Sequence, residues 1–245
     1  MPGNTLRPAA VVLVHGAFAH SSSWARVAGL LRTAGLSVHT PANPLRGLAR
    51  DAAHLGGLVR RIQAPVVLVG HGYGGAVVTQ AATASDNVVA LCYVAAFGLD
   101  AGECVRDVTG RFAPMPLADT ALTTVLPSPS AAGRGHGLYL RADLFPQVYA
   151  ADLPASAGSA LAMAQRPLAR RALTDGACPP AWASLPSWYA IATADRLLNP
   201  TAQRFMAQRM AATEHAVDGS HAVLLSRPEA VAAMIGEAAE RGSGR

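Results

Sequence analysis

Residues 65–75 read PVVLVGHGYGG, and this stretch decides how the chain folds. Its first half, Pro65–Val69, is a short apolar run rich in β-branched residues, which is typical of a buried strand. Its second half, Gly70–Gly75, is dominated by glycine, which permits a tight turn and a close approach of backbone segments. The residues that follow are small and apolar. The stretch therefore predicts a buried strand, a sharp turn and the start of a helix.

Similar apolar runs occur on both sides of this stretch, separated by residues at helical spacing such as Leu48, Ala52 and Leu55. Strands that alternate with helices indicate βαβ units, which build a parallel sheet covered on both faces. The chain is therefore predicted to have an α/β fold. The expected strands are Val11–Val14, Ser37–Thr40, Pro65–Val69, Val88–Ala95, Trp188–Ala192 and Glu214–Val217.

The alternation stops in the middle of the chain and then resumes. The middle part is rich in Pro, Ala and Gly and shows short helical patches, Ala142–Ala150 and Ser156–Gln165, but no strand periodicity. This pattern predicts an insertion over the sheet. We therefore expect a core made of residues 1–98 and 187–245, with residues 99–186 forming a helical cap.

Five phrases of this sequence resemble segments of the α/β-hydrolase fold family. In this family the catalytic residues occur along the chain in the order nucleophile, acid and histidine. The resemblance is closest to small capped esterases and to hydroxynitrile-lyase-like members, and it runs from about residue 10 to residue 239. It implies a mostly parallel sheet of about six strands, flanked by helices, with a helical cap. The phrases are HGAFAHSSSW (15–24), GHGYGGAVV (70–78), QRPLA (165–169), ATADRLLNPTAQRFMAQRM (192–210) and DGSHAVLLSRPEAV (218–231).

The same resemblance implies the roles of seven residues. His221 would be the catalytic base, and Asp195 the acid that orients it, with Asp100 as the other acid position used in this fold. The backbone N–H groups of Ala17 and Tyr73 would form the oxyanion hole. His15 and His71 would be scaffolding of the two turns.

One position departs from the family pattern. The G-x-S-x-G turn reads Gly70-His71-Gly72-Tyr73-Gly74, so Gly72 stands where the nucleophilic serine is expected. Glycine has no side chain to acylate, so the ordinary acyl-enzyme route is excluded. A His–Asp dyad beside an oxyanion hole still predicts general acid/base chemistry on a small apolar carbonyl compound, by cyclisation, elimination, C–C cleavage or direct water attack.

Two other interpretations stay open at this point. In the first, the chain is a conventional serine esterase or lactonase that is present as an inactive Ser→Gly variant. In the second, it is a non-catalytic pseudoenzyme that binds a ligand in the same pocket. Glycine also relieves backbone strain at such a turn, which fits either interpretation.

Gly72 also completes a second motif, because Gly70, Gly72 and Gly75 match the G-x-G-x-x-G dinucleotide fingerprint. That fingerprint requires an acid about 20 residues further on, at the end of the next strand. Asp86 precedes that strand and Asp100 follows it at a longer spacing. We therefore expect no dinucleotide and no other cofactor.

Large apolar side chains are the candidates for the walls of the substrate pocket, although ordinary core packing is the other interpretation of such residues. The candidates are Phe18, Trp24, Phe145, Tyr149, Met163 and Trp182.

Composition limits the partners. The net charge is +5, but all 20 basic residues are scattered arginines and only 5% of residues are aromatic, which argues against nucleic acid. No apolar run reaches the ~18 residues of a membrane helix. The cysteines, Cys92, Cys104 and Cys178, have neither disulfide-framework nor zinc spacing, so no metal is expected. Residues 1–10 do not read as a signal peptide. We expect a cytoplasmic protein with a small-molecule substrate, and leave a homodimer open.

Overall fold

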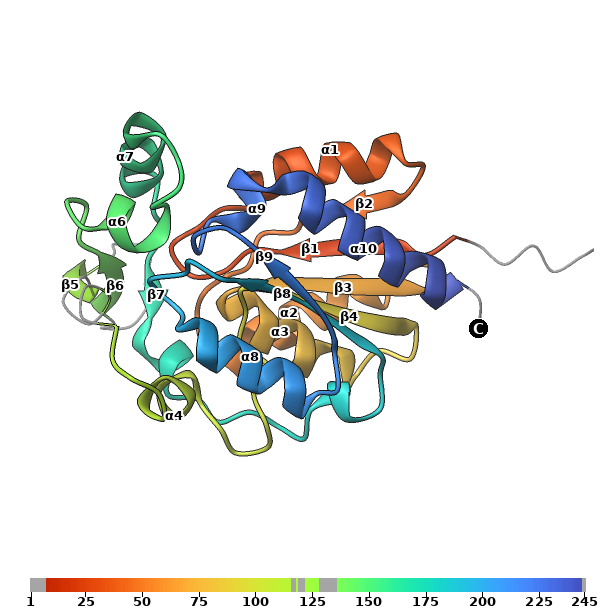
Figure 1. The fold of residues 1–245 in the computed structure, drawn as a ribbon. Coiled ribbons are helices and arrows are strands. Elements are labelled where there is room, and N and C mark those ends of the chain that lie inside the picture. The colour runs from red at the N-terminus through yellow and green to blue at the C-terminus, as the bar shows by residue number, and fades with distance from the viewer. Residues whose placement is uncertain (1–7, 116–117, 119–121, 128–135, 244–245) are drawn as a thin grey trace, which may run out of the picture.

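The computed structural model describes residues 8–115, 118, 122–127 and 136–243. Within them, six strands form one sheet in the order β2-β1-β3-β4-β8-β9, and every neighbouring pair is parallel (Figure 1). The predicted α/β fold is confirmed. The strands are β1 (Ala10–Val14), β2 (Ser37–His39), β3 (Val66–His71), β4 (Val88–Val94), β8 (Ser187–Ala192) and β9 (Thr213–Val217).

Helices cover both faces of this sheet, as a parallel sheet requires. One face carries α1, α9 and α10, and the other carries α2, α3 and α8 (Figure 1). Their bounds are α1 (Ala25–Thr33), α2 (Leu48–Val59), α3 (Tyr73–Ala82), α8 (Pro200–Arg209), α9 (Val223–Ser226) and α10 (Pro228–Ser243).

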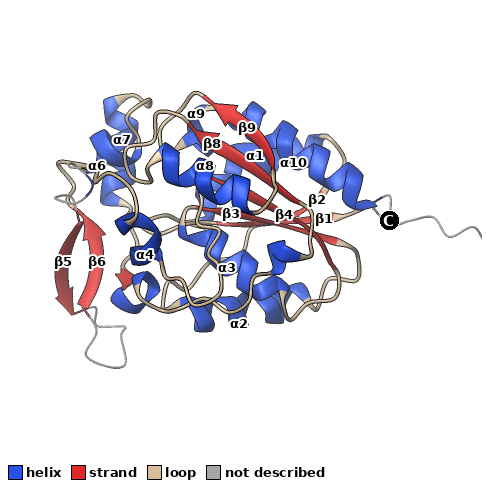
Figure 2. Ribbon diagram, turned by 60° about the horizontal axis from the view of Figure 1, so that its bottom comes forward, coloured by secondary structure: helices blue, strands red, loops and turns tan. Residues whose placement is uncertain are grey.

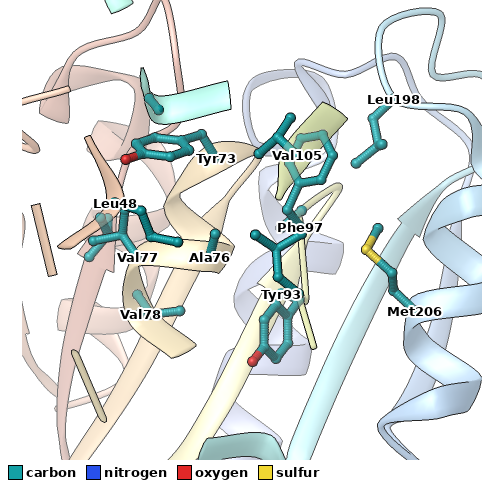
Figure 3. Close-up of a cluster of buried hydrophobic side chains, with 14 of the residues drawn as sticks. Leu48, Tyr73, Ala76, Val77, Val78, Tyr93, Phe97, Val105, Leu198 and Met206 are labelled. Carbon is teal, nitrogen blue, oxygen red and sulfur yellow. The ribbon is translucent and has the colours of Figure 1, made fainter. Parts of the chain in front are cut away.

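The side chains of β1 show how the strands build two cores. Val11 and Leu13 belong to the apolar cluster under α1 and α10, whereas Val12 and Val14 belong to the cluster on the face of α2, α3 and α8. Successive residues of a strand point to opposite faces, so an uninterrupted apolar run buries both faces. Figure 3 shows part of the second cluster, in which residues of α3 pack beside residues of β4 and α8.

The segment between β4 and β8, residues 99–186, folds at one end of the sheet and contains strands that the sequence did not predict (Figure 2). β5 (Leu122–Pro127), β6 (His136–Leu140) and β7 (Leu168–Ala169) form a second, antiparallel sheet. The expectation that this part has no strands was wrong, because β5 and β6 form strands through their pairing with each other and not through a buried apolar run that the sequence reveals. Its helices are α4 (Val105–Gly110), α6 (Phe145–Tyr149) and α7 (Ala155–Met163).

The topology brings two turns together. β1 and β3 are neighbours in the sheet, with Val14 beside Gly70, so the loop after β1 and the turn after β3 begin side by side. Such a place, outside the carboxyl ends of parallel strands, is where ligands bind in α/β sheets. In the part of the chain that the structure describes, no helix has the length and apolar character needed to cross a bilayer.

Candidate active site

The turn after β3 has an unusual backbone at its centre. Gly72 adopts φ 53° and ψ −123°, which residues with a side chain rarely adopt. Its N–H donates to the carbonyl of Val94 (3.2 Å), and its carbonyl accepts from the N–H groups of Gly75 (3.1 Å) and Phe97 (3.0 Å). These bonds tie the turn to β4 and its following loop, and α3 begins at Tyr73. The sequence prediction of strand, sharp turn and helix is confirmed.

His221 and Asp195 form a buried pair on two separate loops. Asp195 follows β8 and His221 follows β9, and these strands are neighbours. Nδ1 of His221 donates to Oδ2 of Asp195 across 2.8 Å, and both side chains are at most 5% exposed. The structure therefore brings together the two side chains that the resemblance named. Asp100 lies elsewhere, where its carboxylate accepts the N–H of Ala101 (2.7 Å).

Asp195 is held by more than the histidine. Its Oδ1 accepts the backbone N–H groups of Leu197 (2.8 Å) and Leu198 (2.9 Å), and its Oδ2 also accepts from Nε2 of Gln203 (2.8 Å). A buried carboxylate that accepts this many hydrogen bonds is fixed in orientation. Gln203, which lies on α8 and is fully buried, is a residue that the sequence analysis missed.

The imidazole of His221 reaches the turn at Gly72. A Cβ built on Gly72 would lie 3.1 Å from Nε2 of His221 and 3.5 Å from its Cε1. Because Nδ1 is occupied by Asp195, the other ring nitrogen is the one that faces residue 72. The ring edge therefore points at the place where the family pattern puts an alcohol oxygen.

Two backbone amides lie at the same place. Ala17, in the loop after β1, and Tyr73, at the start of α3, both line the cavity that contains Gly72 and His221. Neither N–H has a hydrogen-bond acceptor among the described residues. Backbone donors left free at the N-terminus of a helix favour a negatively charged ligand atom.

The side chain of Tyr73 is fixed by a buried acid. Its hydroxyl donates to Oδ2 of Asp51 (2.8 Å), and the carboxylate of Asp51 also accepts the N–H groups of Arg46 (2.9 Å) and Gly47 (3.3 Å). Burial raises the pKa of Asp51, and burial beside this carboxylate raises the pKa of Tyr73 as well. Asp51 therefore holds the residue that carries one of the two free amides, a role that its place on α2 did not reveal.

Two further histidines, His71 and His15, hold the backbone around the site through hydrogen bonds. Nε2 of His71 donates to the carbonyl of His221 (2.9 Å), and the two rings lie 4.6 Å apart. In His15, Nδ1 donates to the carbonyl of Gly16 (2.9 Å) and Nε2 accepts the N–H of Asn43 (2.9 Å). Burial lowers the pKa of His15 to about 4 and that of His71 well below its usual value. Neither lines the cavity, in keeping with the expected scaffolding role.

The cavity in front of His221 has a volume of about 330 Å³, at the small end of the range for ligand sites. Its walls come from the turns of the core and from the segment 99–186. Tyr73, Phe97, Val105 and Leu198, which lie across the upper part of Figure 3, belong to them. Most other wall residues are aliphatic, among them Leu122, Leu140, Leu168, Leu173, Leu197 and Ala202.

Of the predicted pocket residues, only Phe18 lines this cavity. Trp24 is buried on the other face of the sheet, and Trp182 donates its indole N–H to the carbonyl of Leu99 (3.0 Å). Met163 is 82% exposed. Phe145 and Tyr149 stack on each other, and Tyr149 contacts the ring of His221 at 4.9 Å, so these two pack behind His221 and do not form the wall.

The walls that the sequence analysis missed come mainly from the segment 99–186, where aliphatic residues carry no signal that separates a pocket from a core. Within the described ranges, no cluster of three His, Cys, Asp or Glu side chains is arranged to hold a metal ion.

A sequence profile of the Alpha/beta hydrolase family matches residues 11–234, which is nearly the whole chain. The chain belongs to this family. A comparison with curated proteins gives no match. Because the profile spans both parts of the sheet and the segment between them, it places the turn at Gly72 and the loop of His221 in one family fold.

Solved structures of other α/β-hydrolases share this architecture. A pyrethroid hydrolase from Sphingobium faniae is 21% identical with a TM-score of 0.77, covering 95% of this chain and 97% of that one. Polyneuridine aldehyde esterase is 17% identical with a TM-score of 0.80, covering 94% and 99%. Tomato methylketone synthase I, solved with 2-tridecanone, is 16% identical with a TM-score of 0.77, covering 96% and 99%. At these identities the likeness concerns the fold.

Proposed function

We propose that this α/β-hydrolase acts as a cofactor-free general acid/base catalyst on a small apolar carbonyl compound. In this proposal His221 is the base, Asp195 orients it, and the amides of Ala17 and Tyr73 form the oxyanion hole. No acyl-enzyme is formed, because Gly72 supplies no nucleophile. The segment 99–186 serves as the cap over the cavity. We further propose that the protein works in the cytoplasm without a nucleic-acid partner, and leave a homodimer open.

The proposal is supported above all by the placement of Nε2 of His221, which is 3.1 Å from the position that a side-chain carbon on Gly72 would occupy. An oxygen atom of a substrate or of water at that position is within hydrogen-bonding distance of the base. A positioned general base contributes about 10²- to 10⁴-fold to a rate. The hydrogen bonds that hold Asp195 are all present, which favours a working dyad over a pseudoenzyme.

The chemistry follows from these groups. Nε2 takes a proton either from a carbon next to the carbonyl or from a water molecule that attacks the carbonyl carbon. The negative charge that develops on the carbonyl oxygen is stabilised by the two amides. The imidazolium then returns its proton to the leaving group or to a product carbon. Cyclisation, elimination, C–C cleavage and direct hydrolysis all fit this sequence of steps.

The names of the structural neighbours support a carbonyl or ester substrate only as a class, since they describe a hydrolase, an esterase and a protein bound to a methyl ketone. The apolar walls of the cavity favour an apolar substrate body. A substrate of this class buries its body against the aliphatic residues and presents its carbonyl to the amides.

Hydrolysis of p-nitrophenyl acetate, compared between the unmodified protein, His221→Ala and Gly72→Ser, tests the proposal. We expect slow turnover without an initial burst in the unmodified protein, and a loss of about 10²-fold or more in His221→Ala. Gly72→Ser is expected to gain little or no hydrolysis and to be less stable, and a fluorophosphonate probe that reacts with activated serine is expected not to label the unmodified protein. Unchanged turnover in His221→Ala would contradict the dyad mechanism.

The same experiment separates the two alternatives. A serine esterase or lactonase that has lost its nucleophile gains strong, burst-type hydrolysis in Gly72→Ser and is nearly inactive without it. A pseudoenzyme shows no His221-dependent turnover of any carbonyl compound and retains a bound ligand unchanged over long incubation.

A further inference from the structure

The walls of the cavity carry one permanent charge. Among the described residues that line it, Arg106 is the single arginine, and none is an aspartate or a glutamate. The remaining walls are largely aliphatic. Ligand sites carry few polar groups, and those that are present fix the orientation of the ligand.

Arg106 has no protein acid at ion-pair distance within the described ranges, unlike its neighbours. Arg111 pairs with Glu103 at 2.7 Å, and Arg209 pairs with the same carboxylate at 2.8 Å. The acid next to Arg106 in the chain is Asp107, whose carboxylate accepts the N–H of Cys104 (2.8 Å) at the start of α4. The charge of Arg106 also attracts this carboxylate from beyond ion-pair distance, but Arg106 is exposed, lines the cavity and has no ion pair among the described residues, so its donors are available to a ligand.

The other polar side chains of this part of the wall are uncharged and largely hydrogen-bonded within the protein. Thr109, one turn further along α4, donates its hydroxyl to the carbonyls of Val105 and Arg106 (3.1 Å each). Asn199 accepts the N–H of Thr201 (2.8 Å) and donates to the carbonyl of Ala113 (3.2 Å). Of these three wall residues, Arg106 is the one that carries a charge, although one N–H of the Asn199 amide also has no acceptor among the described residues.

We infer that Arg106 binds a carboxylate or another planar anionic group of the substrate, so that the substrate is an organic acid with an apolar body. Arginine presents two parallel N–H donors that match a carboxylate. The apolar body lies against the aliphatic walls, and the reacting carbonyl reaches the amides of Ala17 and Tyr73. This inference rests on the proposed function only for the end of the substrate that carries the reacting carbonyl. The anion subsite, defined here as the part of the cavity wall at Arg106, is inferred only from the charge of that residue.

Binding of octanoate and of 1-octanol, measured by isothermal titration calorimetry, tests the subsite without any turnover. The two probes share a chain and differ in charge. We expect the unmodified protein to bind octanoate about tenfold more tightly than octanol, because an exposed charge-assisted hydrogen bond adds a modest affinity. Arg106→Gln is expected to remove this preference and leave octanol binding unchanged. Added salt is expected to weaken the preference in the unmodified protein.

The matched control is Arg50→Gln, which removes an exposed arginine of α2 that does not line the cavity. It changes the net charge equally and is expected to keep the preference for octanoate. Three results would overturn the inference: an unchanged octanoate affinity in Arg106→Gln, an equal loss in Arg50→Gln, or the absence of binding of either probe to the unmodified protein.

Different results would contradict the anion subsite and the proposed chemistry. The titrations are repeated in His221→Ala, which lacks the proposed base. If the chemistry is wrong but the subsite is right, His221→Ala keeps hydrolytic activity and the octanoate preference still depends on Arg106. If the subsite is wrong, the preference does not depend on Arg106, whatever the activity of His221→Ala.

Discussion

The core and the segment 99–186 contribute to one cavity in different ways. The core has long helices, such as α10 with 16 residues and α2 with 12, packed on a sheet whose central strands are buried on both faces. The described helices of the segment are shorter, with 6, 5 and 9 residues in α4, α6 and α7, and they accompany a small antiparallel sheet. Asp195, His221 and Gly72 all lie at the ends of core strands, whereas the segment contributes wall residues.

This difference indicates that the core, and not the segment 99–186, holds the side chains whose distances must be exact. A proton transfer requires distances held within a fraction of an ångström, and rigid strand ends with many hydrogen bonds provide it. An apolar wall requires shape and exclusion of water, which short elements can provide. We therefore expect core substitutions near the dyad to affect rates strongly, and substitutions in the segment to affect selectivity or nothing.

The largest expected effect is that of Asp195→Asn in the core. The amide cannot hold Nδ1–H of His221 as a carboxylate does, so the base is left in the wrong tautomer and orientation. We expect kcat to fall by about 10³- to 10⁴-fold with a small change in KM. Steady-state kinetics on p-nitrophenyl acetate measure this. A loss of less than tenfold would show that the core does not position the base as described.

The second prediction concerns the junction of the two regions, where Arg166 of the segment reaches His15 of the core (3.3 Å). Burial, with the charge of Arg166 as a smaller cause, lowers the pKa of His15 from 6.5 to about 4. The unfolded chain therefore takes up a proton between these values while the folded protein does not, and stability falls as the pH is lowered. The loss from His15 amounts to about 3 kcal/mol by about pH 4.

Urea denaturation at a series of pH values measures this loss, and His15→Gln is the variant in which the slope is expected to be shallower. His71, whose pKa is also lowered, adds to the fall. Asp51 opposes it, because its raised pKa makes the folded protein take up a proton more readily than the unfolded chain. A pH dependence that is identical in the unmodified protein and in His15→Gln would contradict the prediction.

The smallest expected effect is that of Met163→Gln on α7. Its side chain is 82% exposed and lies outside the cavity wall. Surface substitutions of this kind change stability by less than about 0.5 kcal/mol. We expect neither activity nor the octanoate preference to change, as judged by kinetics, calorimetry and denaturation. A clear loss of activity would place α7 in the site and remove the distinction drawn between core and segment.

Periodicity and turn chemistry predicted the core closely. The expected strand Val11–Val14 is observed as Ala10–Val14, and Trp188–Ala192 as Ser187–Ala192. These strands are buried apolar runs, so local sequence and tertiary environment agree. The resemblance named the pair Asp195 and His221, which the structure brings to 2.8 Å, while their catalytic roles stay a prediction.

The remaining features depend on contacts between distant residues. β7 has two residues, which is too few for a period, and it is a strand only because β6 pairs with it. Gln203 and Asp51 are polar residues on amphipathic helices and read as solvent-facing until the partners that bury them are known. Of the predicted pocket residues only Phe18 reached the wall, because size and hydrophobicity do not distinguish a wall from a packed interior.

The backbone at position 72 favours glycine over any residue that has a side chain. At φ 53° a residue with a side chain bears a strain of about 1–3 kcal/mol, and its Cβ would also push the imidazole of His221 aside. A side chain at position 72 would have to offset this strain, and displace the ring of His221, before it could contribute any chemistry. The turn is relaxed only while glycine occupies it, which leaves the space beside His221 to whatever ligand enters the cavity.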